Sequence, residues 1–117
     1  MITFQDIMVQ VRRWPGVSGC IIAGKDGLSI SALVDDSNFA KSLAAFAPKI
    51  VSRVNEQFTD LGMPEVQELH VPMDDVSTFL FREADVYFIV LYKEASLPHW
   101  YRKVIKAVLE EIGSKHV

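Results

Sequence analysis

Residues 16–33 read GVSGCIIAGKDGLSISAL, and this stretch decides the fold. Two short apolar segments flank the pair Asp26-Gly27, and the stretch comes directly after a predicted helix that ends at Pro15. An Asp-Gly pair tolerates positive φ at both central positions of a tight turn, and the twist of that turn matches the twist of paired strands. The stretch therefore predicts a β-hairpin that follows a helix, and it carries no catalytic motif.

The length and composition of the chain predict one folded domain over residues 1–117. A chain of 117 residues is long enough to bury roughly two-thirds of its unfolded surface, but too short for two independent cores. Half of the residues are apolar, which excludes a disordered chain. The formal net charge of -3, from 12 basic and 15 acidic residues, argues against nucleic acid or an anionic membrane as a partner.

The single cysteine and the hydropathy pattern predict a cytoplasmic protein. Because Cys20 is the only cysteine, an internal disulfide is excluded and a reducing compartment is favoured. Its place in an apolar strand predicts a small buried residue rather than a reactive thiol. No apolar run approaches the roughly 18 residues of a membrane span, and the N-terminus lacks a basic region followed by an apolar stretch.

Apolar residues at helical spacing predict three helices. The first begins after the cap at Thr3 and ends before Pro15, and the last begins after Ser96 and ends near Gly113. The second helix, residues 38–60, is the longest and carries two neighbouring apolar rows: Phe39, Leu43, Phe46, Ile50, Val54 and Phe58 in one, and Ala40, Ala44, Ala47 and Val51 in the other. So broad an apolar sector predicts one contact with the protein's own sheet and another with a second partner. Pro48 predicts a kink, or a break with Pro48 in the first turn of a second piece.

Five segments predict strands: residues 17–24, 28–32, 66–71, 76–82 and 86–92. In the second strand Leu28, Ile30 and Ala32 share one face, which predicts a half-covered strand at an edge. Pro72 cannot donate to a ladder, so the third strand is expected at the opposite edge. Short connections make neighbouring strands antiparallel and place the first strand beside the fifth. The fold class is therefore α+β, a roadblock-like or profilin-like sandwich in the order αββαβββα, whose five-stranded antiparallel sheet has the long helix on one face and the terminal helices on the other.

The sequence shows no pattern typical of an enzyme, a metal site or a cofactor site. The histidines are scattered and no pair has the i, i+4 spacing of a metal site: His70, His99 and His116. The pairs Asp35-Asp36 and Asp74-Asp75 are explained by helix capping and turn formation. The glycines of the hairpin lack the Gly-Lys-Ser/Thr of a phosphate loop, and a strand rather than a helix follows Gly27. We therefore expect no enzyme activity and no cofactor, and GTP is not expected to bind to this chain itself.

Several features together resemble the roadblock/dynein light chain family. These are the element order, the helix stop at Pro15-Gly16-Val17, the hairpin at Asp26-Gly27-Leu28 and the broad, alanine-bearing second helix. The resemblance covers nearly the whole chain and includes GTPase regulators of the bacterial gliding-motility type. Members of the family are non-catalytic dimers that regulate small Ras-like GTPases, act as scaffolds for them, or serve as light chains of dynein. The resemblance implies that two copies pair through residues 38–60 and 66–71 and join two five-stranded sheets into one of ten.

The resemblance and the residues together point to candidate contact positions. The expected partners are a second copy of the chain and a small Ras-like GTPase, whose mobile segments the dimer would hold in one state. An edge strand with few charges and a second apolar row on the helix support the dimer independently. The expected dimer interface comprises Phe39, Leu43, Phe46, Ile50, Val54, Glu68 and His70. The expected contacts with the partner are solvent-facing positions of the same helix: Lys41, Lys49, Arg53 and Glu56.

An alternative interpretation is a ligand-sensing domain of the PAS or profilin-like type, whose antiparallel sheet and flanking helices give a similar element order. Such a sensor needs a cavity between the sheet and a helix. The large phenylalanines are expected to fill that space and so to argue against a sensor: Phe39, Phe46, Phe58, Phe79 and Phe88. A substantial internal pocket would favour the sensor.

Overall fold

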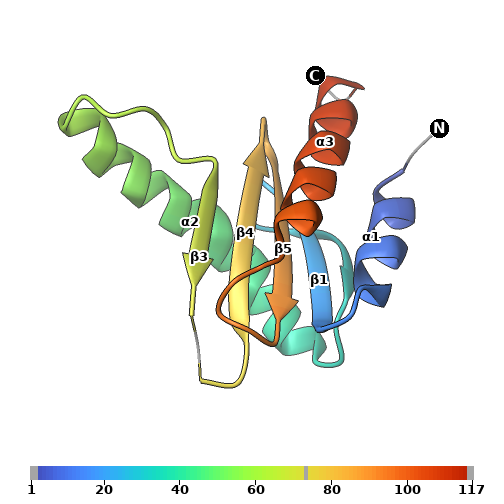
Figure 1. Cartoon of the computed structure of the whole chain (residues 1–117). Helices are drawn as coiled ribbons and strands as arrows, with labels where there is room; N and C mark the ends of the chain where they lie inside the picture. The colour runs from blue at the N-terminus through green and yellow to red at the C-terminus, as the bar shows by residue number, and fades with distance from the viewer. Residues whose placement is uncertain (1–2, 73, 116–117) are drawn as a thin grey trace.

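The helices and strands follow the predicted order. The computed structural model describes residues 3–72 and 74–115. Its elements are α1 (Phe4–Arg13), β1 (Val17–Gly24), β2 (Ser29–Leu33), α2 (Ser37–Asp60), β3 (Glu68–Val71), β4 (Ser77–Glu83), β5 (Val86–Tyr92) and α3 (His99–Lys115). Figure 1 shows a five-stranded antiparallel sheet with helices on both faces, so the predicted α+β class is confirmed.

The first helix and its junction with the sheet follow from local chemistry. The Thr3 hydroxyl accepts a hydrogen bond from the Asp6 N–H at 3.2 Å, and the Asp6 carboxylate accepts one from the Thr3 N–H at 3.0 Å. This capping box satisfies backbone donors that the first turn leaves free. After Pro15, Gly16 adopts a φ of 89°, and a Cβ there would lie 2.5 Å from the ring of Tyr92. Only glycine therefore fits this turn into β1.

The sheet has the strand order β2-β1-β5-β4-β3, with every neighbouring pair antiparallel. The prediction that β2 and β3 form the edges and that β1 lies beside β5 is confirmed. The third strand begins at Glu68 rather than at the predicted residue 66. The reason is local, because the Val66 N–H donates to Asn55 Oδ1 at 2.6 Å instead of to a neighbouring strand.

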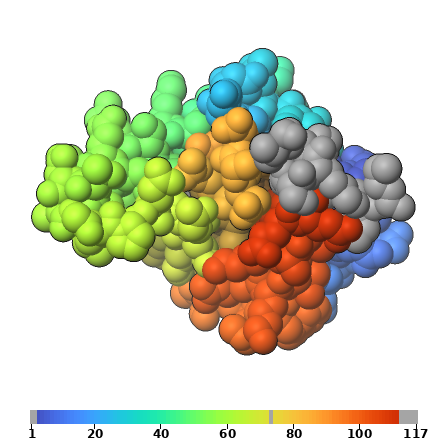
Figure 2. Space-filling view, turned by 90° about the horizontal axis from the view of Figure 1, so that it is seen from above, coloured from blue at the N-terminus to red at the C-terminus, as the bar shows by residue number. Residues whose placement is uncertain are grey.

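Each face of the sheet has its own apolar core. Helices α1 and α3 cover one face, where Met8, Phe88 and Ile105 are fully buried. Helix α2 covers the other face, over Ile21 and Ile89. Figure 2, seen from above, shows the C-terminal part of α2 and the segment before β3 projecting on the side away from α1. The end of α2 and the edge strand β3 therefore lie together at one side of the molecule (Figure 1).

One expectation about the elements loses one of its two alternatives, and two others are wrong. Helix α2 runs without interruption through Pro48, so the predicted alternative of a break is excluded. The apolar face of β2 is not covered, since Leu28 is 68% and Ile30 is 53% exposed. The reason is that the buried side chains beneath α2 come from β1, β4 and β5. Helix α3 continues to Lys115, past the expected end near Gly113.

Candidate dimer and partner-binding surfaces

The alanine row of α2 faces the sheet. Ala44 and Ala47 are fully buried, and Ala40 and Val51 are nearly so. Because these side chains are small, the helix packs close to β1. The helix is fixed at its start by Asp36, whose Oδ1 accepts the N–H groups of the first turn at 2.9 and 3.1 Å.

The second row of α2 stays accessible. We call Phe39, Leu43, Phe46, Ile50 and Val54 the α2 apolar row. Phe39 and Phe46 are exposed, Phe46 by 47%, and the other three are half-buried. The expectation that Phe39 and Phe46 fill the space between sheet and helix is therefore wrong. The smaller alanine row occupies that space, and the larger side chains lie outside it.

Strand β3 continues this apolar surface at the edge of the sheet. Leu69 packs against the buried cluster beneath α2, and the exposed Val71 lies on the same face because side chains alternate along a strand. β3 pairs only with β4 among the strands that the structure describes. Its outer backbone groups are therefore open to another strand. The alternation of Gln67, Leu69 and Val71 in the sequence was the signal for this face, but neither Leu69 nor Val71 was among the candidate residues.

The two polar candidates on β3, Glu68 and His70, lie on the opposite face of the strand. The Glu68 carboxylate accepts from Arg102 Nη2 at 2.6 Å and from Lys106 Nζ at 3.0 Å, both on α3. Burial raises the pKa of the Glu68 carboxyl, but the hydrogen bonds and charges of these two cations outweigh burial and hold that pKa below its ordinary value. The His70 ring stacks on Phe79 with centroids 4.3 Å apart. The seven interface candidates thus divide between two faces of the sheet.

The four candidate partner contacts lie on the exposed side of α2. Lys49, Arg53 and Glu56 line a surface hollow of about 610 Å³ together with the β1–β2 turn. At this turn a Cβ on Gly27 would lie 3.3 Å from the Cα of Ala45, so the turn rests directly against α2. Lys41 is exposed nearer the start of the helix. The helix therefore presents two cations and one anion beside the hairpin turn, and a third cation nearer its start.

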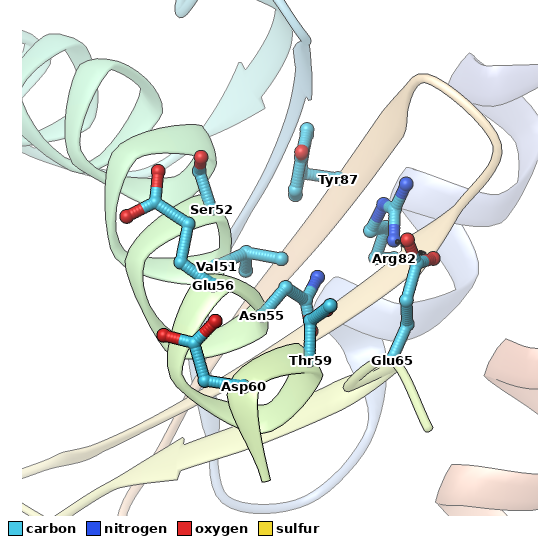
Figure 3. Close-up of a pocket in the computed structure, with 9 residues that line it drawn as sticks. All are labelled: Val51, Ser52, Asn55, Glu56, Thr59, Asp60, Glu65, Arg82 and Tyr87. Atoms are coloured by element: carbon cyan, nitrogen blue, oxygen red, sulfur yellow. Dashed lines mark hydrogen bonds and ion pairs between the residues drawn. The ribbon is translucent and has the colours of Figure 1, made fainter. Parts of the chain in front are cut away.

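A second hollow of about 670 Å³ lies between the C-terminal half of α2 and strands β4 and β5 (Figure 3). Figure 3 shows Asn55 pointing from α2 toward Arg82 and Glu65, which form an ion pair at 3.1 Å. Glu56 and Asp60 of α2 point away from the sheet (Figure 3). Both hollows are open at the surface and lined mainly by polar side chains. They offer polar contacts to a macromolecule rather than an enclosed apolar cavity for a small ligand.

Cys20 is buried in the core, as predicted. Its Sγ lies 3.5 Å from the Met8 carbonyl oxygen, and burial raises the pKa of its thiol to about 12. The thiol is therefore protonated at physiological pH. Within residues 3–72 and 74–115, no group of three or more His, Cys, Asp or Glu side chains is placed to hold a metal ion. In the same part of the chain, no helix is both long and apolar enough to cross a membrane.

Most of the amino-acid sequence matches a known domain family. Residues 3–93 match the Roadblock/LC7 domain. The chain belongs to the Roadblock/LC7 family. A comparison with curated proteins finds no match. The match spans the capped start of α1 through the end of β5 and therefore includes both α2 and β3.

Solved structures share this roadblock fold. A Roadblock/LC7 domain from Streptomyces avermitilis has a TM-score of 0.78 at 20% identity, covering 94% of this chain and 93% of its own. MglB of Myxococcus xanthus has a TM-score of 0.80 at 17% identity, with 98% of both chains covered. The gliding protein MglB of Thermus thermophilus has a TM-score of 0.75 at 11% identity, covering 95% of this chain and 85% of its own. At these identities the similarity concerns the fold.

Proposed function

We propose that this roadblock domain forms a homodimer through α2 and β3, and that the dimer binds a small Ras-like GTPase and changes its nucleotide cycle or its location. The observation that supports the dimer most is the accessible α2 apolar row beside the open edge of β3. In a dimer with a two-fold axis, the α2 apolar row of one copy would face the same row of the other, and β3 would pair with β3. Such an interface is isologous. One association would then cover the apolar row and pair the two free edges.

The symmetry makes the interface sensitive to single substitutions. Full burial of a large apolar side chain contributes about 1.5–3 kcal/mol. Phe46 is 47% exposed, so its burial in a dimer would contribute roughly half of that amount in each copy. Because every residue of the α2 apolar row occurs twice in the dimer, one charged substitution removes two such contributions and places two charges in the interface.

The proposed role of the dimer is regulatory and non-catalytic. The GTPase would supply the nucleotide, and the exposed side of α2 would contact the GTPase through Lys41, Lys49, Arg53 and Glu56. A dimer that binds one conformation of the GTPase more tightly shifts its population toward that conformation. The similarity to structures named MglB, one of them described as a gliding protein, supports a role of the gliding-motility type.

Size-exclusion chromatography with light scattering tests the dimer. We expect the wild type to have twice the mass of the chain at micromolar concentration. Ile50→Asp should shift the protein to the monomer, because it places a charge in the α2 apolar row. Ser52→Asp is the matched control, since it adds the same charge to an exposed position of the same helix. A monomeric wild type would overturn the proposal.

A pull-down from the native extract, probed for proteins that bind labelled GTP, tests the partner. The wild-type dimer should capture such a protein, and the double variant with Lys49→Glu and Arg53→Glu should capture much less. Light scattering on the same variant checks that it remains a dimer. Equal capture by both proteins would contradict the assignment of these residues, and no capture of a GTP-binding protein by the wild type would contradict the proposed partner.

A further inference from the structure

A surface groove lies between α1 and α3, on the face of the sheet opposite to α2 (Figure 1). Its volume is about 450 Å³, and its apolar lining comes from both helices: Ile7, Trp14, Trp100, Val104 and Val108. Trp100 is 54% and Val104 is 38% exposed, so large apolar side chains of α3 stay accessible here. The groove is therefore an apolar surface that the chain itself does not cover.

Three aromatic rings meet at one end of the groove. Tyr101 is buried, and its hydroxyl donates a hydrogen bond to the Pro15 carbonyl oxygen at 2.9 Å. The centroids of the Trp14 and Trp100 rings lie 4.4 and 4.3 Å from that of Tyr101 and 5.1 Å from each other. The anchored tyrosine thus holds two indole rings in fixed positions at the surface, where they lose little entropy when a ligand binds.

The two indoles also have hydrogen-bond donors to offer. Within residues 3–72 and 74–115, neither the Trp14 nor the Trp100 N–H donates to another group. Neither nitrogen is among the buried atoms that lack a partner, so both N–H groups reach the surface. An indole nitrogen can only donate. A fitting ligand therefore supplies carbonyl oxygens together with apolar groups that pack on the rings.

An extended proline-rich segment meets both requirements. In the polyproline II conformation the backbone carbonyls make no internal hydrogen bonds, and the proline rings pack in aromatic-lined grooves. A docked α-helix would use its carbonyls internally and leave both indole N–H groups unpaired. The groove between Trp100 and Val108 is about 12 Å long, which about four residues in the polyproline II conformation span. A stable dimer needs about 800 Å² from each copy, so a groove this short suits a peptide better than a second copy of the chain.

The charges beside the groove give the peptide a preferred direction. Arg13 precedes Trp14, and Lys103 follows Trp100 by one helical turn, so both cations lie at the aromatic end. Both side chains are exposed, and neither forms an ion pair within the part of the chain that the structure describes. Asp6 lines the groove on α1, two turns before Arg13. An acidic residue of the ligand is therefore favoured beside the indoles.

We propose that the groove between α1 and α3 binds a proline-rich segment of a partner protein in the polyproline II conformation, with an acidic residue of that segment beside Arg13 and Lys103. This site goes beyond the proposed function, because the dimer and the GTPase contacts use α2 and β3, and α2 covers the other face of the sheet. The domain would then hold a second protein while its α2 side remains free for the GTPase.

Intrinsic tryptophan fluorescence tests the site, because the chain has two tryptophans and both line the groove. The probe is a synthetic peptide of about eight prolines preceded by a pair of glutamates. It should change the emission saturably, and a matched peptide with a pair of lysines should bind about fivefold more weakly. That preference should shrink at high salt, which screens exposed charges. No saturable change with either proline peptide at millimolar concentration would overturn the proposal.

Calorimetry with the same acidic peptide tests the residues. Trp100→Ala should weaken binding at least about tenfold, since exposed aromatic anchors contribute most to such contacts. Leu61→Ala is its matched control, because it shortens another exposed apolar side chain, on the α2 side of the sheet. Val104→Asp keeps both indoles and should also weaken binding about tenfold. Ser52→Asp adds the same charge to an exposed position of α2 and should have no effect.

Circular dichroism checks that each variant is folded, and unchanged affinity in both groove variants would overturn the site. The double variant with Arg13→Glu and Lys103→Glu tests the direction of the peptide. It should prefer the lysine peptide over the glutamate peptide, because the charges at the aromatic end are reversed. A preference that stays with the glutamate peptide would contradict the placement of the acidic residue.

Two outcomes would assign the groove to another occupant and overturn the proposal. One is tighter binding of an amphipathic helical peptide than of the proline peptide. The other is a wild-type mass above that of a dimer in light scattering, if Val104→Asp abolishes it, because a second copy would then cover the groove. Ile50→Asp should bind the acidic proline peptide with wild-type affinity. The α2 dimer and the groove can therefore fail independently of each other.

Discussion

Replacing Glu68 by glutamine should lower the free energy of unfolding by about 1.5 kcal/mol. The Glu68 side chain is 18% exposed and accepts hydrogen bonds from Arg102 at 2.6 Å and from Lys106 at 3.0 Å. A hydrogen bond to a charged group contributes about 1.5–3 kcal/mol, and an exposed ion pair only about 0.2–1 kcal/mol. Because both cations are partly exposed, we take each contact to contribute about 1 kcal/mol to the free energy of unfolding. Glutamine retains part of this contribution, because its side-chain carbonyl oxygen still accepts a hydrogen bond.

Urea denaturation at fixed protein concentration measures this effect. With a dependence on urea of about 1.5 kcal/mol per molar, the midpoint of Glu68→Gln should fall by about 1 M at pH 7. Glu65→Gln is the matched control, because Glu65 pairs with Arg82 at 3.1 Å but is 61% exposed. Its substitution should cost less than about 0.5 kcal/mol. Equal midpoints for the two variants would refute the argument that burial decides the strength of these contacts.

The pH dependence gives a second readout for the same residue. The folded protein holds the pKa of Glu68 below its ordinary value of 4.5, so the unfolded chain binds the proton more readily. The stability that Glu68 contributes is therefore complete above about pH 5 and is lost as the pH falls below 4.5 toward the folded pKa. The difference between wild type and Glu68→Gln should shrink over that range. A difference that stays constant down to about pH 3 would contradict the ionic origin of the effect.

Three further outcomes test other parts of the structure. In thermal denaturation, Gly16→Ala should lower the free energy of unfolding by about 2–4 kcal/mol, because Gly16 has a φ of 89° and the added Cβ would meet the ring of Tyr92. Gly62 has a φ of 74° with open space around it, so Gly62→Ala should lower it by only about 1 kcal/mol. Asp36→Ala should cost about 1 kcal/mol by circular dichroism in urea, since it removes the cap of α2. Cys20 should resist a thiol reagent at pH 8 in the native protein and react in urea, because its pKa is about 12 in the fold; rapid native reaction would contradict its burial.

The order of the elements could be predicted because each boundary has a local cause. Thr3 and Asp6 form the expected capping box, and the helix stops at the residues before Pro15. The hairpin turns at Asp26-Gly27, with Gly27 at a φ of 79°. Short connections and the apolar run at residues 86–92 then determine the strand order. None of these inferences requires knowledge of contacts between distant residues.

The orientation of α2 could not be predicted with the same ease. Both apolar rows have helical spacing, so periodicity alone does not tell which of them faces the sheet. Side-chain size is what decides, because the small row that includes Ala44 and Ala47 allows a closer approach to the sheet than Phe39 and Phe46 would. The sequence contained this signal, but large side chains were assumed to fill the interior.

The exposure of β2 was beyond sequence reasoning for a different reason. Alternation does not reveal that the pairing of β1 with β2 shifts register at Ile30, and it cannot tell whether a helix covers Leu28 and Ile30. Helix α2 approaches β1 and β2 more closely than the other strands, yet the side chains of Leu28 and Ile30 remain exposed. Likewise, alternation places Glu68 and Leu69 on opposite faces of β3. It cannot tell that Arg102 and Lys106 of α3, a helix far along the chain, pair with Glu68.

The two edges of the sheet differ in how well each suits pairing with another strand. At β3 the pairing of four residues would be joined by burial of the α2 apolar row, which supplies most of the free energy. At β2 the pairing with β1 shifts register at Ile30, and such a bulge is one of the devices by which natural edge strands avoid pairing with another chain. The β3 edge should therefore be the one that associates, and the joined sheet should have β2 at both ends.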